Sequence, residues 1–168
     1  RSGTLLHGWI EEHFARASIV DLDDLPGFVD AGDEADEDGA ILQARKERFL
    51  ASPWASRTPR ALELPVETVV DGISLRGRLD AVFDEPGGRV VIVDWKNARP
   101  PTGRALAARS LQLSVYRLAY ARLTGRPLEE VDAVFYFAET GETVRPAQGR
   151  AAEEEIRAQL EALHGELE

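Results

Sequence analysis

The chain contains no cysteine and no methionine, and no apolar run approaches the length of a membrane-spanning helix. Without cysteine it cannot form disulfides, thiolate metal sites or iron–sulfur clusters, and it has no cysteine nucleophile. This is compatible with a reducing compartment, and we expect a cytoplasmic protein. The absence of methionine, together with Arg1 at the first position, predicts that the sequence is a segment cut from a longer polypeptide.

Basic residues are outnumbered by acidic ones, 20 to 30, which gives a formal net charge of −10. This balance argues against a domain that binds nucleic acid by itself through a broad basic surface. Much of the acid lies in two blocks, 21–38 and 153–168, where it can sit far from any cleft. Carboxylates that hold a metal also count as negative charge until the metal binds. The charge therefore leaves open a site that receives its substrate from a neighbouring domain.

The order of expected elements indicates an α/β or α+β fold, with a mixed central sheet flanked by helices. A chain of 168 residues is long enough for one domain, 1–168, with one substantial core. The acid-rich stretch 21–39 is expected to be a surface loop. Hydrophobic periodicity predicts helices over 4–17, 40–50, 104–124 and 151–167, an antiparallel meander of strands over 62–70, 73–84 and 89–96, and a further strand over 131–138 with a short return through 144.

The stretch 77–97 is the centre of the expected meander, because charged residues lie there at the ends of apolar strands. Asp80 interrupts one apolar run, and the next, from 90 to 93, ends in Asp94, Trp95 and Lys96. Strand alternation puts Asp94 and Lys96 on one face and Trp95 on the other. Two carboxylates and a lysine on rigid strands can bind a divalent cation and act on reacting oxygens. The structural alternative is a partly buried Asp–Lys ion pair at a strand end.

Three polar side chains elsewhere are further candidates. His7 points toward the apolar side of the first predicted helix, where a histidine is more often a hydrogen-bonded core residue than a ligand. Gln112 and Tyr116 are four residues apart and share one face of the helix over 104–124. By themselves they favour the structural alternative, a polar shoulder beside a packed face.

Taken together, these pieces resemble the RecB-like branch of the PD-(D/E)XK nuclease superfamily, over nearly the whole chain and in the order of that branch's motifs. The D-x-K motif alone is a weak signal, whereas five elements in order are a specific one. The matching residues are His7 on the N-terminal helix, Glu63 before the first core strand, Gly77 to Asp80 as the GxxD motif, Asp94-Trp95-Lys96 as the D-x-K motif, and Gln112 to Tyr116 as the QxxxY motif.

The resemblance implies a restriction-endonuclease-like core and metal-dependent hydrolysis of phosphodiester bonds. His7, Asp80 and Asp94 would bind Mg²⁺ or Mn²⁺, with the backbone carbonyl of Trp95 as a further ligand. The metal would activate water and neutralise charge on the phosphate. Lys96 would orient the attacking water and stabilise the charge that develops.

The remaining matched residues have supporting roles in this scheme. Gln112 and Tyr116 would position the phosphate or the lysine, and Glu63 would hold a water network or a second metal. Arg78 shares a strand face with Asp80 and would contact the DNA backbone or form an ion pair with a nearby carboxylate.

Relatives of this kind usually form the C-terminal part of a helicase–nuclease, such as the AdnAB or UvrD/RecB types, that processes DNA double-strand breaks. The resemblance thus implies single-stranded DNA as substrate, delivered by a helicase domain in the same chain. It also implies that the partner of this chain is a second helicase–nuclease subunit. The alternative is a catalytically silent module that grips DNA or holds subunits together. The presence of all the motif residues favours an active enzyme.

Overall fold

The computed structural model describes residues 4–16, 39–146, 154, 156–158 and 161 of the chain. The predicted acidic loop over 21–39 lies outside these residues, except that Gly39 begins a helix, and most of the predicted C-terminal helix also lies outside them. Elsewhere the predicted helices and strands are confirmed to within one or two residues. The elements are α1 (Thr4–Arg16), α2 (Gly39–Ala51), β1 (Ala61–Val70), β2 (Ile73–Asp84), a 3₁₀ turn (Pro86–Gly88), β3 (Val90–Lys96), α3 (Gly103–Thr124), a second 3₁₀ turn (Leu128–Glu130), β4 (Val131–Phe137) and β5 (Glu142–Val144).

The five strands form one mixed sheet in the order β1-β2-β3-β4-β5, as expected. β1, β2 and β3 are the predicted antiparallel meander, and β4 lies parallel to β3 and antiparallel to β5. The parallel pair follows from the connection, because a strand that returns through a long helix re-enters the sheet in the same direction. β1 is an edge strand, which accommodates Pro65.

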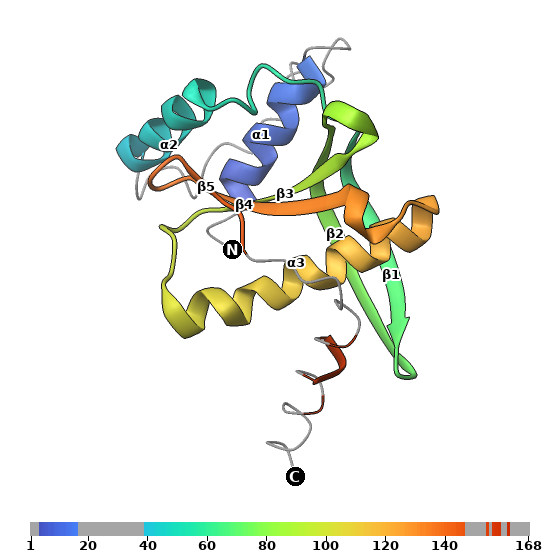
Figure 1. Ribbon diagram of the computed structural model, residues 1–168. Coiled ribbons are helices and arrows are strands. Elements are labelled where there is room, and N and C mark those ends of the chain that lie inside the picture. Colours follow the sequence, from blue (N-terminus) through green and yellow to red (C-terminus); the bar gives the residue numbers. More distant parts are fainter. Residues whose placement is uncertain (1–3, 17–38, 147–153, 155, 159–160, 162–168) are drawn as a thin grey trace.

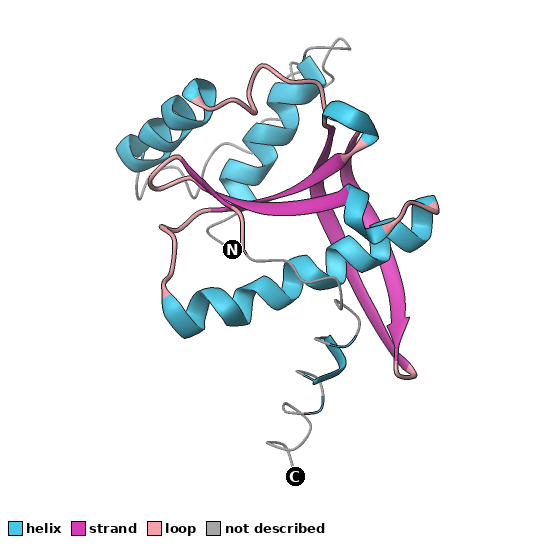
Figure 2. Cartoon of the chain, in the orientation of Figure 1, coloured by secondary structure: helices cyan, strands magenta, loops and turns pink. Residues whose placement is uncertain are grey.

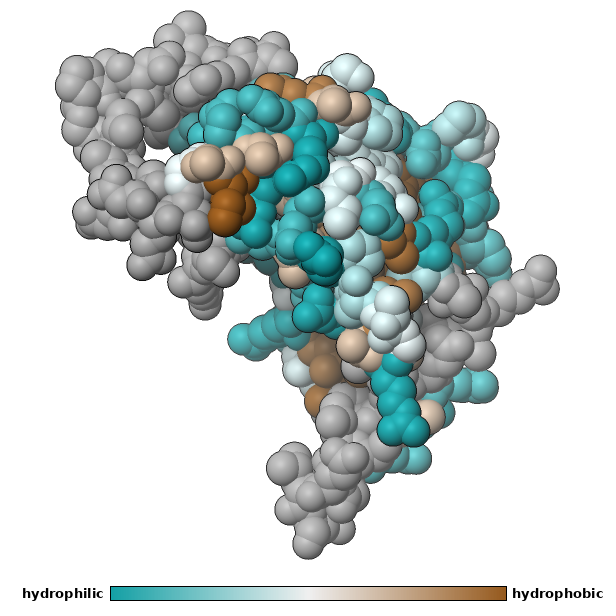
Figure 3. Space-filling view, turned by 90° about the vertical axis from the view of Figure 1, so that its left-hand side faces the viewer, coloured by the Kyte–Doolittle hydropathy of each residue, from teal (hydrophilic) through white to brown (hydrophobic). Residues whose placement is uncertain are grey.

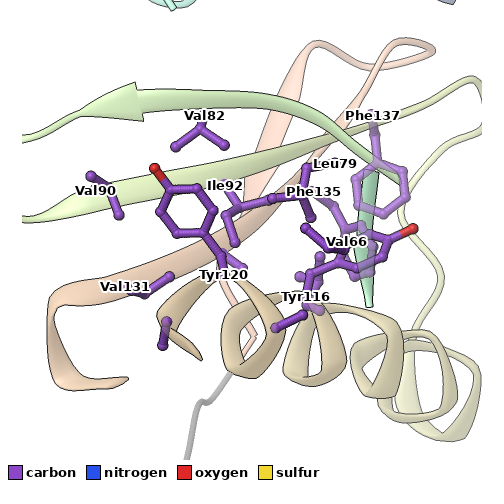
Figure 4. Packing of buried hydrophobic residues seen from close by; sticks show 14 residues of the cluster. Val66, Leu79, Val82, Val90, Ile92, Tyr116, Tyr120, Val131, Phe135 and Phe137 are labelled. Atoms are coloured by element: carbon purple, nitrogen blue, oxygen red, sulfur yellow. The ribbon is translucent and has the colours of Figure 1, made fainter. Parts of the chain in front are cut away.

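Helices cover both faces of the sheet: α1 and α2 lie on one side and α3 on the other (Figure 1). Each face has its own buried core. β3 serves both, because Ile92 packs toward α3 while Val93 and Trp95 pack toward α1 and α2. The alternation predicted for this strand is therefore confirmed. Figure 4 shows the core on the α3 side, where Tyr116 and Tyr120 project from the helix toward the sheet.

In β1 and β2 the alternation of side chains between the two faces of the sheet is broken at one level. Leu62 packs toward α1 and α2, but Leu64, two residues later, packs toward α3. On β2, Leu79 packs toward α3 and Ala81 toward α1 and α2. Regular alternation would put each pair on one face. The break on β1 falls at Glu63, whose φ of 47° lies in the left-handed region that non-glycine residues rarely adopt.

α3 is fixed at its C-terminal half by a buried arginine. Arg117 donates hydrogen bonds to the carbonyls of Leu128 and Val131, at 3.2 and 2.7 Å, and so ties the helix to the start of β4. The helix ends at Gly125, which takes the left-handed conformation that closes helices (φ 70°). Figure 2 shows the short turn that then leads into β4.

None of the helices in the described parts of the chain is long and apolar enough to cross a membrane. The face seen in Figure 3 is mostly hydrophilic, with small and separate hydrophobic spots. Such scattered apolar residues are normal for a protein surface.

Candidate functional site

Three acidic residues lie at one level of the sheet, one on each of three neighbouring strands. The β1–β2 register pairs Leu62 with Ala81 and Leu64 with Leu79, which puts Glu63 opposite Asp80. The β2–β3 pairing begins at Ala81 and Val93, so Asp80 and Asp94 come at the next position. No ladder pair forms at this level in either register. Carboxylates thus gather where the main-chain hydrogen bonding between the strands is interrupted.

Asp80 is the most strongly perturbed of the three. Its Oδ2 accepts a hydrogen bond from the backbone N–H of Trp95 at 2.8 Å, and its Oδ1 lies 3.8 Å from His7 Nδ1. Burial raises the pKa of Asp80 to about 9, and the negative charge of Asp94 and a hydrogen bond with that side chain contribute to the rise. At neutral pH Asp80 therefore keeps its proton when no cation is bound.

Lys96 lies between the second carboxylate and α3. Its Nζ is 2.8 Å from Asp94 Oδ2 and donates a hydrogen bond to Gln112 Oε1 at 3.0 Å. The same ammonium lies 5.7 Å from the centre of the Phe135 ring. The Asp–Lys ion pair proposed as a structural alternative is therefore present. It is part of a larger network, because the lysine is held from β3, β4 and α3 together.

The two polar residues of α3 form one unit. Gln112 Nε2 donates to the Tyr116 hydroxyl at 2.9 Å, which leaves the Gln112 carbonyl oxygen free to accept from Lys96. The Tyr116 hydroxyl also hydrogen-bonds the backbone of Arg78, and burial raises the pKa of this tyrosine. Gln112 and Tyr116, for which a purely structural role was the alternative, thus point toward Lys96. Gln112 contacts the lysine directly, and Tyr116 contacts Gln112.

His7 reaches the site from the opposite face of the sheet. Besides its approach to Asp80, it hydrogen-bonds the backbone of Trp95. Burial lowers the pKa of His7, although the Trp95 bond opposes this. A neutral imidazole is the form that binds metals. The predicted inward direction of His7 is confirmed. By contrast, His13 also faces inward but lies away from these carboxylates. Its Nε2 is 2.7 Å from the Ala55 carbonyl oxygen, a contact that serves the fold.

Glu63 and Arg78 lie at the outer edge of the site. Arg78 Nη1 is 3.8 Å from Glu63 Oε2, so the ion pair, one of the two expectations for Arg78, is observed. Burial raises the pKa of Glu63, with further contributions from the charges of Glu11 and Asp94. Glu11 was not among the residues predicted from the sequence. It follows His7 by four residues on α1, and that helical spacing is the signal that would have found it.

The chemistry of this donor set fits a hard divalent cation. Carboxylate oxygens and one imidazole are ligands that Mg²⁺ and Mn²⁺ accept. The proton retained by Asp80 indicates an excess of negative charge that a cation would relieve. However, no three histidine, aspartate or glutamate side chains among the described residues are already arranged to hold an ion. The assignment of His7, Asp80, Asp94 and the Trp95 carbonyl as ligands therefore stays a prediction.

Comparison with known proteins gives a curated relative and a solved structure. The chain is 29% identical over 108 residues to an ATP-dependent helicase/nuclease subunit from Alkaliphilus oremlandii (strain OhILAs), and the match covers 61% of this chain but 9% of that protein. The crystal structure of SSO0001 superposes with a TM-score of 0.42 at 18% identity, over 78% of this chain and 62% of that one. That likeness is too slight to support an argument.

The family assignment rests on a whole-chain match. The model of the PD-(D/E)XK nuclease superfamily matches residues 1–168, and a mixed sheet with helices on both faces agrees with its fold. Similarity to a helicase/nuclease subunit is consistent with the RecB-like branch. The resemblance drawn from the motifs is confirmed: this chain belongs to the PD-(D/E)XK nuclease superfamily.

Proposed function

We propose that the chain is a metal-dependent DNA nuclease that hydrolyses phosphodiester bonds. The observation that carries this proposal is the contact network of Lys96, which joins Asp94 Oδ2 at 2.8 Å and Gln112 Oε1 at 3.0 Å beside the protonated Asp80. A structural ion pair needs no third partner from a helix. A lysine that must present its ammonium in a fixed direction to a reacting phosphate does need one.

Each residue has a role that its position supports. Asp80, Asp94, His7 and the Trp95 carbonyl would hold Mg²⁺ or Mn²⁺, which supplies water activation and charge neutralisation when bound. Lys96 orients the attacking water and stabilises negative charge as it develops on the phosphate oxygens.

The outer residues support this centre. Gln112 and Tyr116 keep Lys96 in place through the hydrogen bonds described above. Glu63, which lies opposite Asp80 on β1, would hold a water network or a second metal. Arg78 pairs with Glu63 in the free protein and, with its side chain 61% exposed, can also reach the DNA backbone.

The biological setting is proposed from the similarity to a helicase/nuclease subunit. In the repair of double-strand breaks, single-stranded DNA would be delivered to the site by a helicase domain of the same chain, and the partner would be a second helicase–nuclease subunit. A motor that supplies most phosphate contacts would reconcile a DNA substrate with a net charge of −10. In this setting the isolated chain needs little basic surface of its own.

The proposal is tested by incubating the protein at high concentration with end-labelled single-stranded DNA and Mn²⁺. Wild type should degrade the DNA, and Asp94→Ala and Lys96→Ala should reduce the rate by about a hundredfold or more. EDTA should abolish cleavage. The proposal fails if wild type is inactive within the full-length helicase–nuclease, or if both variants degrade DNA as fast as wild type. Inactivity there would favour the silent DNA-gripping or scaffolding module.

The chain offers matched controls for both substitutions. Lys46→Ala removes the only other lysine, which lies on α2 over the Trp9 ring. Asp84→Ala removes an exposed carboxylate that pairs with Arg60 at the far end of β2. Both control variants should cleave at the wild-type rate. A general effect of lost charge would lower all four rates together.

A further inference from the structure

Gly77 lies on β2 directly against the ring of Tyr116. A Cβ added at Gly77 would come within 2.6 Å of Tyr116 Cε1 and 3.4 Å of its Cζ and hydroxyl oxygen. Non-bonded carbons pack at about 3.5 to 4.0 Å, so any side chain here would force the ring to move by about 1 Å. The β2 backbone thus meets the tyrosine only because residue 77 has no side chain.

Backbone conformation does not explain this glycine. The positive φ values that favour glycine occur at Gly72 and Gly87, among others, and Gly77 is not among these residues. It lies in regular antiparallel pairing opposite Val66. Alanine would fit the backbone here, so the requirement for glycine comes from the tyrosine ring alone.

The ring has little freedom to retreat. Tyr116 is 8% exposed and is packed in the core between α3 and the sheet, where Leu79 and Leu113 are also buried. Its hydroxyl is held by Gln112 Nε2 at 2.9 Å and by the backbone of Arg78. A shift of the ring must therefore stretch or break at least one of these hydrogen bonds.

The position of the Gln112 amide depends on the tyrosine. An amide group has one donating end and one accepting end. With Nε2 bonded to the Tyr116 hydroxyl, Oε1 points to Lys96 Nζ at 3.0 Å. The ammonium only donates and so favours Oε1 in any case, but if the tyrosine moves, the Nε2 end loses its anchor and the amide can swing away from Lys96. The position of Lys96 thus depends on contacts that begin at Gly77.

We propose that Gly77 is a positioning residue for Lys96, acting through Tyr116 and Gln112. Its missing side chain admits the tyrosine, the tyrosine anchors the amide, and the amide holds the lysine. This inference deepens the proposed nuclease function, and the part of it that concerns cleavage rates rests on that function. The position of Lys96 can be tested without measuring nuclease activity.

The position of Lys96 can be followed by NMR, because the chain has few lysines. Lys46 and Lys96 are the only two in the chain, so protein labelled with ¹⁵N-lysine gives one side-chain ammonium signal from the site and one internal reference on α2. Gly77→Ala should shift the Lys96 signal, or broaden it by faster hydrogen exchange, and leave the Lys46 signal in place. Gly39→Ala is the matched control, because a Cβ there meets nothing within 4 Å.

Two further variants separate positioning from a loss of folding. Tyr116→Phe keeps the ring against Gly77 but removes the hydroxyl, and it should move the Lys96 signal in the same way. Tyr116→Leu removes Cε1, so Gly77→Ala in that background should cause no further change in the Lys96 signal. An unchanged Lys96 signal in Tyr116→Phe would overturn the inference, even if Gly77→Ala does not fold.

Activity provides the second measurement. Gly77→Ala should lower the cleavage rate by about ten- to a hundredfold with little effect on KM, since a small misplacement of a catalytic group is costly. In the Tyr116→Leu background the same substitution should lower the rate no further. An equal loss in both backgrounds would contradict a route through Tyr116. If wild type cleaves nothing, the proposed function fails, while the lysine signals still decide this inference.

Discussion

The backbone N–H of Trp95 donates a hydrogen bond to Asp80 Oδ2 at 2.8 Å, just outside the pair Ala81–Val93 that bounds the β2–β3 ladder. A carboxylate thus takes the place of a main-chain carbonyl in joining the two strands. Because Trp95 lies between Asp94 and Lys96, this bond fixes Asp80 relative to both of them. The same bond keeps a buried acid in the fold, which has a cost in stability.

Asp80→Asn should stabilise the metal-free protein at neutral pH. Burial raises the pKa of Asp80 in the folded state to about 9, above its ordinary value of 3.8. The folded state therefore binds more protons than the unfolded state between these values, and stability is lost as the pH rises through this window. Asparagine carries no charge and keeps an acceptor for Trp95. We expect a gain of about 1 to 4 kcal/mol at pH 7 in urea unfolding.

Unfolding measured at several pH values checks the cause. Between about pH 5 and pH 8, wild type should lose stability with rising pH more steeply than Asp80→Asn. Asp84→Asn, which alters the exposed acid of the same strand, should keep the wild-type slope. Parallel curves for wild type and Asp80→Asn would contradict the raised pKa of Asp80.

Cation binding should release a proton. With the pKa of Asp80 at about 9, Mn²⁺ must displace the proton that this side chain retains at neutral pH. Below that value, we expect the apparent affinity to rise by up to about tenfold for each unit of increasing pH. Calorimetry in buffers with different ionisation enthalpies measures the released proton directly. The same heat of binding in all buffers would count against Asp80 as a ligand.

Gln112→Ala should lower kcat and leave KM nearly unchanged. The substitution removes the 3.0 Å hydrogen bond to Lys96 but not the ion pair with Asp94, so the lysine keeps its carboxylate partner and loses the contact that fixes the direction of its Nζ. We expect a loss of about ten- to a hundredfold in single-turnover cleavage of DNA. Gln43→Ala is the matched control, since Gln43 lies exposed on α2 and bonds only Glu47 among its observed partners. A Gln112→Ala variant with the wild-type kcat would show that Lys96 is positioned by other contacts.

Arg117→Met should destabilise the fold without changing the site. It leaves the carbonyls of Leu128 and Val131 without the donors that bond them at 3.2 and 2.7 Å. Buried acceptors that lose a partner cost about 1 to 3 kcal/mol each. Urea unfolding should detect this loss, whereas the Lys96 ammonium signal should keep its position. A variant as stable as wild type would mean that these two bonds contribute little.

The elements and the central motif could be predicted because their signals are local. The apolar run from 90 to 93 and the charged residues after it determined the faces of β3, and helical spacing placed Gln112 beside Tyr116. The parallel position of β4 also follows from a general rule, since a helix of 22 residues precedes it. The family resemblance then joined pieces far apart in the sequence.

Features that depend on distant contacts could not be predicted. The left-handed φ of 47° at Glu63 has no local signal, because glutamate has no preference for that conformation. The space under the Tyr116 ring is occupied from Gly77 on a different element, and only the folded chain brings the two together. Arg117 reads as one more surface arginine on α3, yet it is 5% exposed, because carbonyls before β4 accept from it.

The break in alternation at Glu63 and Asp80 divides the long β1–β2 hairpin into two segments that tolerate sequence changes differently. Between Leu62 and Leu64 the alternation of side chains between the two faces is broken, but the β1–β2 register is the same before and after this break. The outer segment can thus be shortened or lengthened at its tip, around Asp71 and Gly72, by equal numbers of residues on each strand. Such changes leave every acid of the site at its level in the sheet.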